Sequence, residues 1–268
     1  MPFAPAEKNN VVKVNATHIH YDFSGAEDAP VLLLSHSLGT NFAMWDAQLP
    51  QPSKSFRVLR YDTRGHGQSE ISRGPYDFDK LGRDVLGLAD ELGISKFSFC
   101  GLSMGGVTGM WLGINASYRL HKLVLCSTAP KIGNADTWNA RIEAVRKDGM
   151  KAVAPGTMER WFTAGFRNRE PQTVERIQKM VESTDPQGFI ACCEALREAD
   201  FRESIKQIRT PTLVISGTHD PGTPPADGKF LAKQIEGAHY VELDAAHLSN
   251  IEQHDRFTQE VSDFVQGA

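Results

Sequence analysis

The sequence contains no long hydrophobic run and no excess of positive charge. Its apolar stretches all fall well short of the ~20 residues that a membrane-spanning helix needs. With a net charge of −4 and a pI near 6.1, the composition does not favour binding to nucleic acid or to an anionic membrane. The first residues, MPFAPAEKNN, lack the basic and apolar regions of a secretory signal. We therefore expect a cytoplasmic protein that binds neither membranes nor nucleic acid.

Cysteine is scarce, and its spacing suits neither a metal site nor a disulfide framework. The chain has four cysteines, Cys100, Cys126, Cys192 and Cys193. Two fall in apolar segments and two are adjacent, a pattern typical of reduced thiols. His18 and His20 share one face of an apolar segment, but no third metal ligand accompanies them. The glycine motifs of dinucleotide and P-loop sites are also missing. We expect no metal and no cofactor.

What the sequence does contain is an alternation of buried-strand and helix patterns. The segments 31–36, 97–100 and 122–127 have the apolar character of buried strands, and 56–62 is a further predicted strand. The segment 11–23 is predicted to form two short strands with a turn near Asn15. Between them, 78–92 has helical periodicity with Gly93 placed to end it. Such alternation predicts an α/β fold, with a mostly parallel, twisted sheet flanked by helices.

The pattern changes after the first half of the chain. From 131 to 199 strand runs vanish, and helical segments rich in Met, Trp, Arg and Glu follow one another between turns that contain Pro or Gly. Strand–helix alternation then resumes with 210–220 and 239–247, and a helical C-terminal segment closes the chain. We predict that 131–199 is an inserted helical cap on a core of 1–130 and 200–268, the alternative being helices that lie on the core itself.

The segment Lys96–Trp111 carries the strongest functional signal. The apolar run leads directly into Gly101-Leu102-Ser103-Met104-Gly105, after which a helix can begin. A G-x-S-x-G between a strand and a helix is typical of a nucleophile elbow, where a strained turn exposes a serine. Glycine is suited to 101 and 105 because the backbone passes close to other backbone there. Ser103 is therefore the candidate nucleophile.

Asp220 and His247 also follow predicted strands, and the carboxyl ends of parallel strands meet at one edge of a sheet. A serine needs a base such as imidazole to take its proton, and a carboxylate orients that imidazole. We predict a Ser103–His247–Asp220 triad. Other candidates are His36, His219 and His254 for the base and Asp244 for the acid.

Two loops beside this edge are candidates for further roles. The loop after 31–36 contains Leu38, whose backbone N–H, together with that of Met104, is predicted to form an oxyanion hole. The loop 63–69 follows Asp62 and contains Arg64 and His66. These three charged residues either take part in catalysis or, as we favour, form hydrogen bonds within a glycine-rich loop.

The sequence resembles the α/β-hydrolase family throughout its length, and within it looks most like 3-oxoadipate enol-lactonases. The matching stretches are LSHSLGTNFAMWDAQL, VLRYDTRGHGQS, FCGLSMGG, LVISGTHD and AAHLSNIEQ. The order Ser, Asp, His is also that of the family. The resemblance implies hydrolysis of 3-oxoadipate enol-lactone to 3-oxoadipate in bacterial aromatic-acid breakdown, the β-ketoadipate pathway. It also implies a helical cap, no cofactor and a cytoplasmic location, and leaves the oligomeric state open.

A small lactone substrate that bears a carboxylate calls for a cation in the pocket. Candidates among the basic residues of the cap are Lys131, Arg141, Arg160 and Arg167. Arg141 lies three residues after Trp138 and so shares its helical face. We predict that Arg141 binds the carboxylate against an apolar wall formed by Trp138, although Arg141 could equally be a solvated surface residue. The other functions considered are a general carboxylesterase and a ligand receptor of low turnover.

Overall fold

The computed structural model describes residues 10–267, so the start of the predicted core (1–9) lies outside the described residues. It contains an eight-stranded sheet in the order β1-β2-β4-β3-β5-β6-β7-β8. The strands are β1 (Val11–Val14), β2 (Thr17–Ser24), β3 (Val31–Ser35), β4 (Arg57–Tyr61), β5 (Phe97–Leu102), β6 (Leu120–Cys126), β7 (Thr212–Gly217) and β8 (His239–Leu243). From β4 to β8 all neighbouring pairs are parallel, whereas β1 and β2 form an antiparallel hairpin with its turn at Asn15. The predicted mostly parallel sheet is confirmed.

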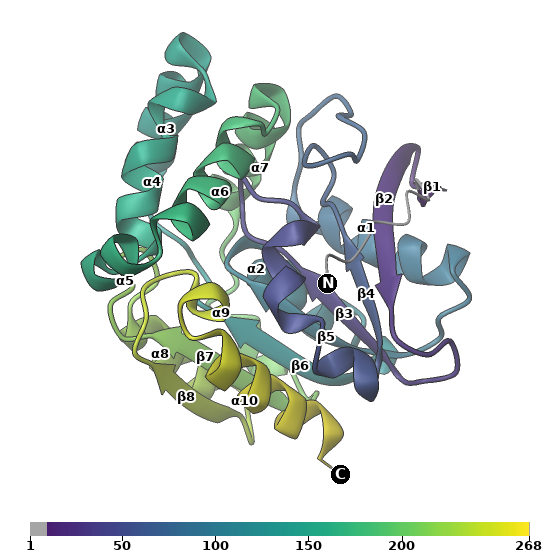
Figure 1. Cartoon of the computed structure of the whole chain (residues 1–268). Coiled ribbons are helices and arrows are strands. Elements are labelled where there is room, and N and C mark those ends of the chain that lie inside the picture. Colours follow the sequence, from purple (N-terminus) through teal and green to yellow (C-terminus); the bar gives the residue numbers. More distant parts are fainter. Residues whose placement is uncertain (1–9, 268) are drawn as a thin grey trace.

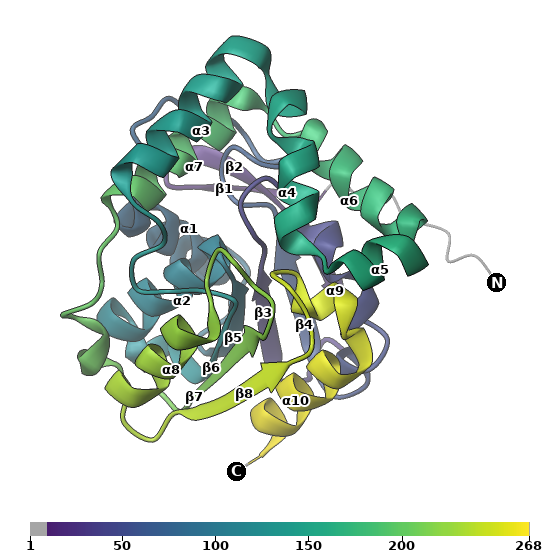
Figure 2. The ribbon, with the colours of Figure 1, turned by 90° about the vertical axis from the view of Figure 1, so that its left-hand side faces the viewer.

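Helices cover both faces of this sheet (Figure 1). One face carries α1 (Phe78–Glu91), α2 (Met104–Asn115) and α8 (Pro225–Gln234) (Figure 2). The other face carries α10 (His254–Gln266), which follows the short α9 (Ser249–Glu252). Short 3-10 helices occupy Phe42–Gln48, Pro52–Lys54, Ser117–Arg119, Met150–Ala152 and Ile205–Gln207. None of the helices in the described part of the chain is long and apolar enough to cross a membrane.

α1 shows how local sequence sets these boundaries. The Asp77 side chain accepts the N–H of Lys80 at 2.7 Å and so caps the first turn. Leu81 and Leu88 are fully buried on one stripe. Gly93, at φ +68°, then ends the helix, as its sequence position predicts.

The chain between β6 and β7 forms a layer of helices above the sheet edge at which the parallel strands end (Figure 2). Its helices are α3 (Ala135–Asp148), α4 (Ala154–Trp161), α5 (Ala164–Arg169), α6 (Pro171–Glu182) and α7 (Pro186–Glu198). The predicted helices of this stretch are confirmed. Proline lies in the first turn of α4, α6 and α7, where its missing N–H costs nothing.

The C-terminal segment differs from the continuous helix that its spacing suggests. α9 ends before Gln253, whose φ of −124° and ψ of 46° are not helical, and α10 begins at His254. The Gln253 side chain donates to the carbonyl of Asp244 at 2.8 Å. A tertiary contact to the end of β8 therefore accompanies the break.

Candidate active site

Ser103 occupies the turn between β5 and α2, with φ 57° and ψ −113°. A positive φ is uncommon for a residue other than glycine and costs roughly 1–3 kcal/mol. A Cβ at Gly101 would collide with the carbonyl of Gly105, and a Cβ at Gly105 would collide with the carbonyl of Ser35. The predicted strand–turn–helix context of the G-x-S-x-G is confirmed.

The main chain of Ser103 is held on both sides. Its N–H donates to the carbonyl of Cys126 at 2.9 Å, and its carbonyl accepts the Thr128 hydroxyl at 2.9 Å. Because the main chain is fixed to β6 and the loop that follows it, the turn can hold its strained geometry.

Asp220 and His247 lie on the loops that follow the neighbouring parallel strands β7 and β8. His247 Nδ1 lies 2.6 Å from Asp220 Oδ2. Asp220 also accepts the N–H groups of Gly222 and Thr223 at 2.8 and 3.1 Å, and the Thr223 hydroxyl at 2.7 Å. Burial disfavours ionisation of Asp220, but the His247 ring and the Thr223 donors hold the pKa of this carboxyl below its usual value. The carboxylate is therefore charged and oriented towards the imidazole.

The alternative bases and acid lie elsewhere. His219 pairs with Asp244 at 2.7 Å, and both side chains are more than half exposed. His254 is exposed beside Asp255. His36 is buried, and its Nε2 accepts the N–H of Thr63 at 2.9 Å. None of these alternative residues lines the cavity described next.

Ser103, Asp220 and His247 line one cavity of about 250 Å³ between the sheet edge and the helical layer. This volume lies below the ~300–1,000 Å³ of pockets for drug-sized ligands, so it suits a smaller molecule. Within the described residues no hydrogen bond joins the Ser103 hydroxyl to His247. In substrate-free enzymes the distance between a catalytic serine and its histidine often exceeds that of a hydrogen bond, and it shortens when substrate binds.

Leu38 also lines the cavity, and Met104 is the first residue of α2. Their backbone N–H groups donate to no other residue in the range 10–267. The N–H of Met104 is free because the first turn of a helix has no intrahelical acceptor. Both donors are thus available to an anion beside Ser103.

Two buried histidines fix the loop that contains Leu38. His66 Nε2 accepts the N–H of Gly39 at 2.9 Å, and His36 Nδ1 donates to the carbonyl of Ser37 at 2.8 Å. Burial lowers the pKa of both rings, that of His66 to about 3 with a further contribution from His36. Both histidines therefore stay neutral and act as structural hydrogen-bond partners.

These values predict a pH dependence of stability. Above pH 6.5, the ordinary pKa of the ring, His66 is neutral in both the folded and unfolded states. Between about 6.5 and about 3 only the unfolded chain binds the proton, so the free energy of unfolding falls by about 1.4 kcal/mol per pH unit for this residue. In His66→Gln the amide oxygen can still accept the Gly39 N–H, so the decline in urea-unfolding free energy below pH 6.5 should be shallower by that amount. The exposed control His254→Gln should keep the wild-type slope, and equal slopes for all three proteins would contradict this assignment.

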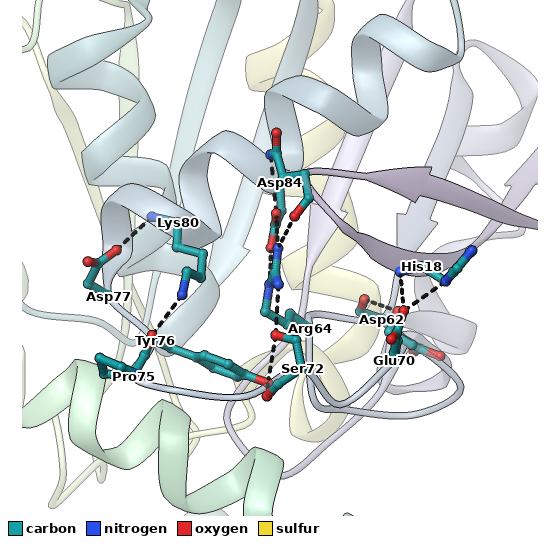
Figure 3. A network of polar contacts seen from close by, with 12 residues as sticks. His18, Asp62, Arg64, Glu70, Ser72, Pro75, Tyr76, Asp77, Lys80 and Asp84 are labelled. Atoms are coloured by element: carbon teal, nitrogen blue, oxygen red, sulfur yellow. Dashed lines mark hydrogen bonds and ion pairs between the residues drawn. The ribbon is translucent and has the colours of Figure 1, made fainter.

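Asp62 and Arg64 are held by hydrogen bonds and lie outside the cavity lining. Asp62 accepts the N–H groups of Phe42 and Gln68 at 2.8 and 2.9 Å. Figure 3 shows Arg64 against Asp84, with Nη2 and Oδ1 2.6 Å apart. These contacts agree with the favoured structural interpretation of the cluster. Only the bond from Gln68 lies within the glycine-rich loop, because Phe42 and Asp84 belong to other elements. In the same region His18 pairs with Glu70 and His20 with Asp62.

Two of the four candidate cations, Arg141 and Arg160, reach the cavity. Arg141 and Arg160 line it, and neither forms an ion pair with another described residue. The Arg141 guanidinium lies 4.9 Å from the centre of the Trp138 ring, which is also in the wall. Lys131 instead pairs with Asp200, and Arg167 donates to the carbonyl of Phe162.

The two arginines make the cavity electropositive. Burial lowers the pKa of both guanidinium groups, and the positive charge of Arg160 lowers that of Arg141 further. Since arginine remains protonated in proteins, both side chains carry a positive charge in the cavity wall. Asp220 is the acidic residue of the wall and already binds His247. The site can therefore accept an anion.

Trp161 is a cavity residue that sequence reasoning missed. Its ring stacks on that of His247, with centroids 6.0 Å apart and planes at 23°. Nothing in the pattern around the end of α4 distinguishes this aromatic side chain from the other aromatic residues of the helical layer. Only the packing of α4 on the His247 loop reveals its place.

Comparison with known proteins agrees with this geometry. The model of the alpha/beta hydrolase fold family matches residues 30–253. This chain belongs to the alpha/beta hydrolase family. It is 43% identical to 3-oxoadipate enol-lactonase 2 of Acinetobacter baylyi over 91% of each chain, and 41% identical to enol-lactonase 1 of that organism over 90% of this chain and 91% of the other. The solved structure of the enol-lactonase from Burkholderia xenovorans LB400 superposes with a TM-score of 0.94 at 48% identity, covering 96% of this chain and 99% of that one.

The family resemblance inferred from the motifs is thus confirmed. In this alpha/beta hydrolase the strands from β3 to β8, the elbow at Ser103 and the Asp220–His247 contact all fall within the matched range, whereas the β1–β2 hairpin precedes it. The similarity to enol-lactonases spans nearly the whole chain, including the helices between β6 and β7.

Proposed function

We propose that this protein hydrolyses 3-oxoadipate enol-lactone to 3-oxoadipate in the β-ketoadipate pathway of aromatic-acid catabolism. The observation that carries the proposal is a small cavity holding a serine at an elbow, an Asp–His pair and two arginines without ion-pair partners. A small molecule with an ester bond and a carboxylate matches this cavity, because the ester bond suits Ser103 and His247 and the carboxylate suits the two arginines. The substrates named for its relatives have this chemistry.

The mechanism follows from the side chains at the sheet edge. His247 Nε2 takes the proton of Ser103 while Oγ attacks the lactone carbonyl carbon, and Asp220 stabilises the imidazolium through Nδ1. The N–H groups of Met104 and Leu38 stabilise the resulting oxyanion. The carbonyl–oxygen bond of the ring then breaks, and the enol oxygen leaves with the proton from His247.

The second half of the reaction releases the acid. The opened chain stays attached to Ser103 as an ester, and its enol converts to the ketone of 3-oxoadipate. A water molecule gives a proton to His247 and attacks the acyl carbon. Collapse of this second tetrahedral intermediate returns the proton to Ser103 Oγ, so no cofactor takes part.

The helical layer supplies the specificity in this proposal. Residues 131–199 form a cap domain on a hydrolase core of 1–130 and 200–268, and Arg141 binds the substrate carboxylate beside Trp138. Arg160, another of the four candidate cations, provides a second positive charge in the same wall. We place the enzyme in the cytoplasm, where aromatic acids are degraded.

Replacing Arg141 by glutamine should raise KM for the enol-lactone by about 10- to 100-fold, because a charge-assisted hydrogen bond contributes roughly 1.5–3 kcal/mol. kcat should change little, since the carboxylate is bound equally in the ground and transition states. The measurement is steady-state kinetics on the lactone and on the uncharged ester p-nitrophenyl acetate, whose KM should stay unchanged. Arg146→Gln, an exposed arginine of the same helix, is the matched control. A wild-type KM for the lactone in the Arg141 variant would remove this residue from the binding site.

A general carboxylesterase with the same triad is the alternative. The two unpaired arginines favour the lactone, because simple aryl esters have no charge to match them. The kcat/KM for the enol-lactone should exceed that for p-nitrophenyl acetate, and the reverse order would favour the esterase. Multiple turnovers of either substrate would exclude a receptor of low turnover.

A further inference from the structure

Glu252, the last residue of α9, is a buried carboxylate with an unusual set of partners. It is 8% exposed and forms no ion pair with a cation in the described range. One oxygen, Oε2, accepts the N–H groups of Ala246 and Thr163, at 3.0 and 3.3 Å. The other, Oε1, accepts the Thr163 hydroxyl. Glu252 thus joins the residue before His247 to the start of α5.

A second contact joins the same two segments on the other side of His247. The N–H of Leu248 donates to the carbonyl of Trp161 at 3.1 Å. The Trp161 ring itself stacks on the His247 ring. The residues directly before and after His247 are therefore both tied to 161–163, once through Glu252 and once directly.

The chemistry of a carboxylate explains why glutamate fits this position. Burying a charge is costly unless hydrogen bonds replace its hydration, and here three donors do so. A glutamine would offer one acceptor oxygen and turn an amide N–H₂ towards further donors, which leaves polar groups unpaired. An apolar residue would leave all three donors without an acceptor.

We propose that Glu252 is a positioning residue that holds the His247 loop and the 161–163 segment of the helical layer as one unit. This role rests on the proposed function of His247 as the base. The helical layer contributes Arg160 and Trp161 to the cavity, so the same carboxylate sets both the imidazole and part of the binding wall. The position of the 161–163 segment and the placement of the base are then coupled rather than independent.

The test uses Glu252→Gln, Thr163→Val and the double variant, with Glu260→Gln of α10 as control, because Glu260 pairs with Arg256 away from this loop. kcat and KM are measured on the enol-lactone and on p-nitrophenyl acetate, well below each melting temperature. Glu252→Gln should lower kcat on both substrates by about 10- to 100-fold, as expected for a misplaced catalytic group. Adding Thr163→Val should then lower kcat little further, because both changes disrupt the contact between Glu252 and Thr163. The valine also removes the N-cap of α5, where the Thr163 hydroxyl accepts the N–H of Phe166, and this second effect is read from the melting temperature.

A second measurement is independent of turnover. The imidazole Nδ1–H proton of His247, assigned by its loss in His247→Gln, should give a downfield NMR signal that broadens in Glu252→Gln and stays sharp in Glu260→Gln. A purely structural role would lower the melting temperature and leave both kcat and this signal unchanged, and that result would overturn the proposal. So would additive losses in the double variant.

The outcomes separate this inference from the proposed function. If the wild-type protein hydrolyses the aryl ester but not the lactone, the lactonase assignment fails, and the ester kinetics with the NMR signal still decide the role of Glu252. If Glu252→Gln does not fold, Thr163→Val decides it. A wild-type kcat and an unchanged signal in Thr163→Val would overturn the proposal, whereas a loss of both would support it.

Discussion

Ser103→Ala is expected to lower kcat by about 10⁴- to 10⁶-fold, since removal of the nucleophile in a serine triad costs this much. The remaining rate would come from the N–H groups of Leu38 and Met104 and from substrate binding alone. The fold should persist, because the main-chain bonds of Ser103 to Cys126 and Thr128 do not involve its hydroxyl. Turnover of the enol-lactone and thermal unfolding are the measurements.

Ser127→Ala is a matched control for this change. Ser127 follows the neighbouring strand β6, also has a positive φ (42°), and its buried hydroxyl has no hydrogen-bond partner in the described structure. Its replacement should leave kcat within about twofold, as expected for a residue outside the reacting groups. Comparable activity in the Ser103 and Ser127 variants would rule out Ser103 as the nucleophile.

Asp220→Asn should lower kcat by about 10⁴-fold with little loss of stability. The asparagine oxygen can still accept the N–H groups of Gly222 and Thr223, as Oδ1 does now. Its amide nitrogen then faces His247 Nδ1, which must become the acceptor. The proton of the imidazole moves to Nε2, so the ring can no longer take the proton of Ser103.

Asp244→Asn tests the alternative acid. Asp244 is 83% exposed in its pair with His219, so this change should leave kcat unchanged. The measurement is steady-state kinetics of the two variants. Each kcat is normalised to the concentration of active sites, which is titrated with a fluorophosphonate that reacts with the serine. A large loss in the Asp244 variant with near-normal turnover in the Asp220 variant would reverse the assignment of the acid.

Local signals predicted the elements of the sheet well. The apolar runs around β3, β5 and the second half of β6 are nearly continuous, because strands buried on both faces need no polar alternation. The elbow was predictable for a different reason. Only glycine fits at 101 and 105, so the steric requirement of the turn can be recognised from the five consecutive residues 101–105.

The helical layer was predictable as helices but not as a binding wall. Arg141 and Arg160 face the cavity while Lys131 and Arg167 do not, although all four are basic residues in one stretch of helices and turns. Which of them turns inward depends on how each segment packs over the sheet edge. The local sequence does not specify this packing, so the direction of each basic side chain could not be predicted from it.

The sequence by itself determined the strand–helix alternation, the strained serine turn and the candidate Ser, Asp and His at strand ends. These follow from short-range sterics, hydrophobic periodicity and the rule that parallel strands end at one edge. Tertiary structure alone decided which cations stay unpaired, that Trp161 lies on His247, and that Glu252 bridges two segments 89 residues apart. The physical reason is that a hydrogen bond or a ring contact depends on distances below about 4–6 Å, which only the packed chain brings about.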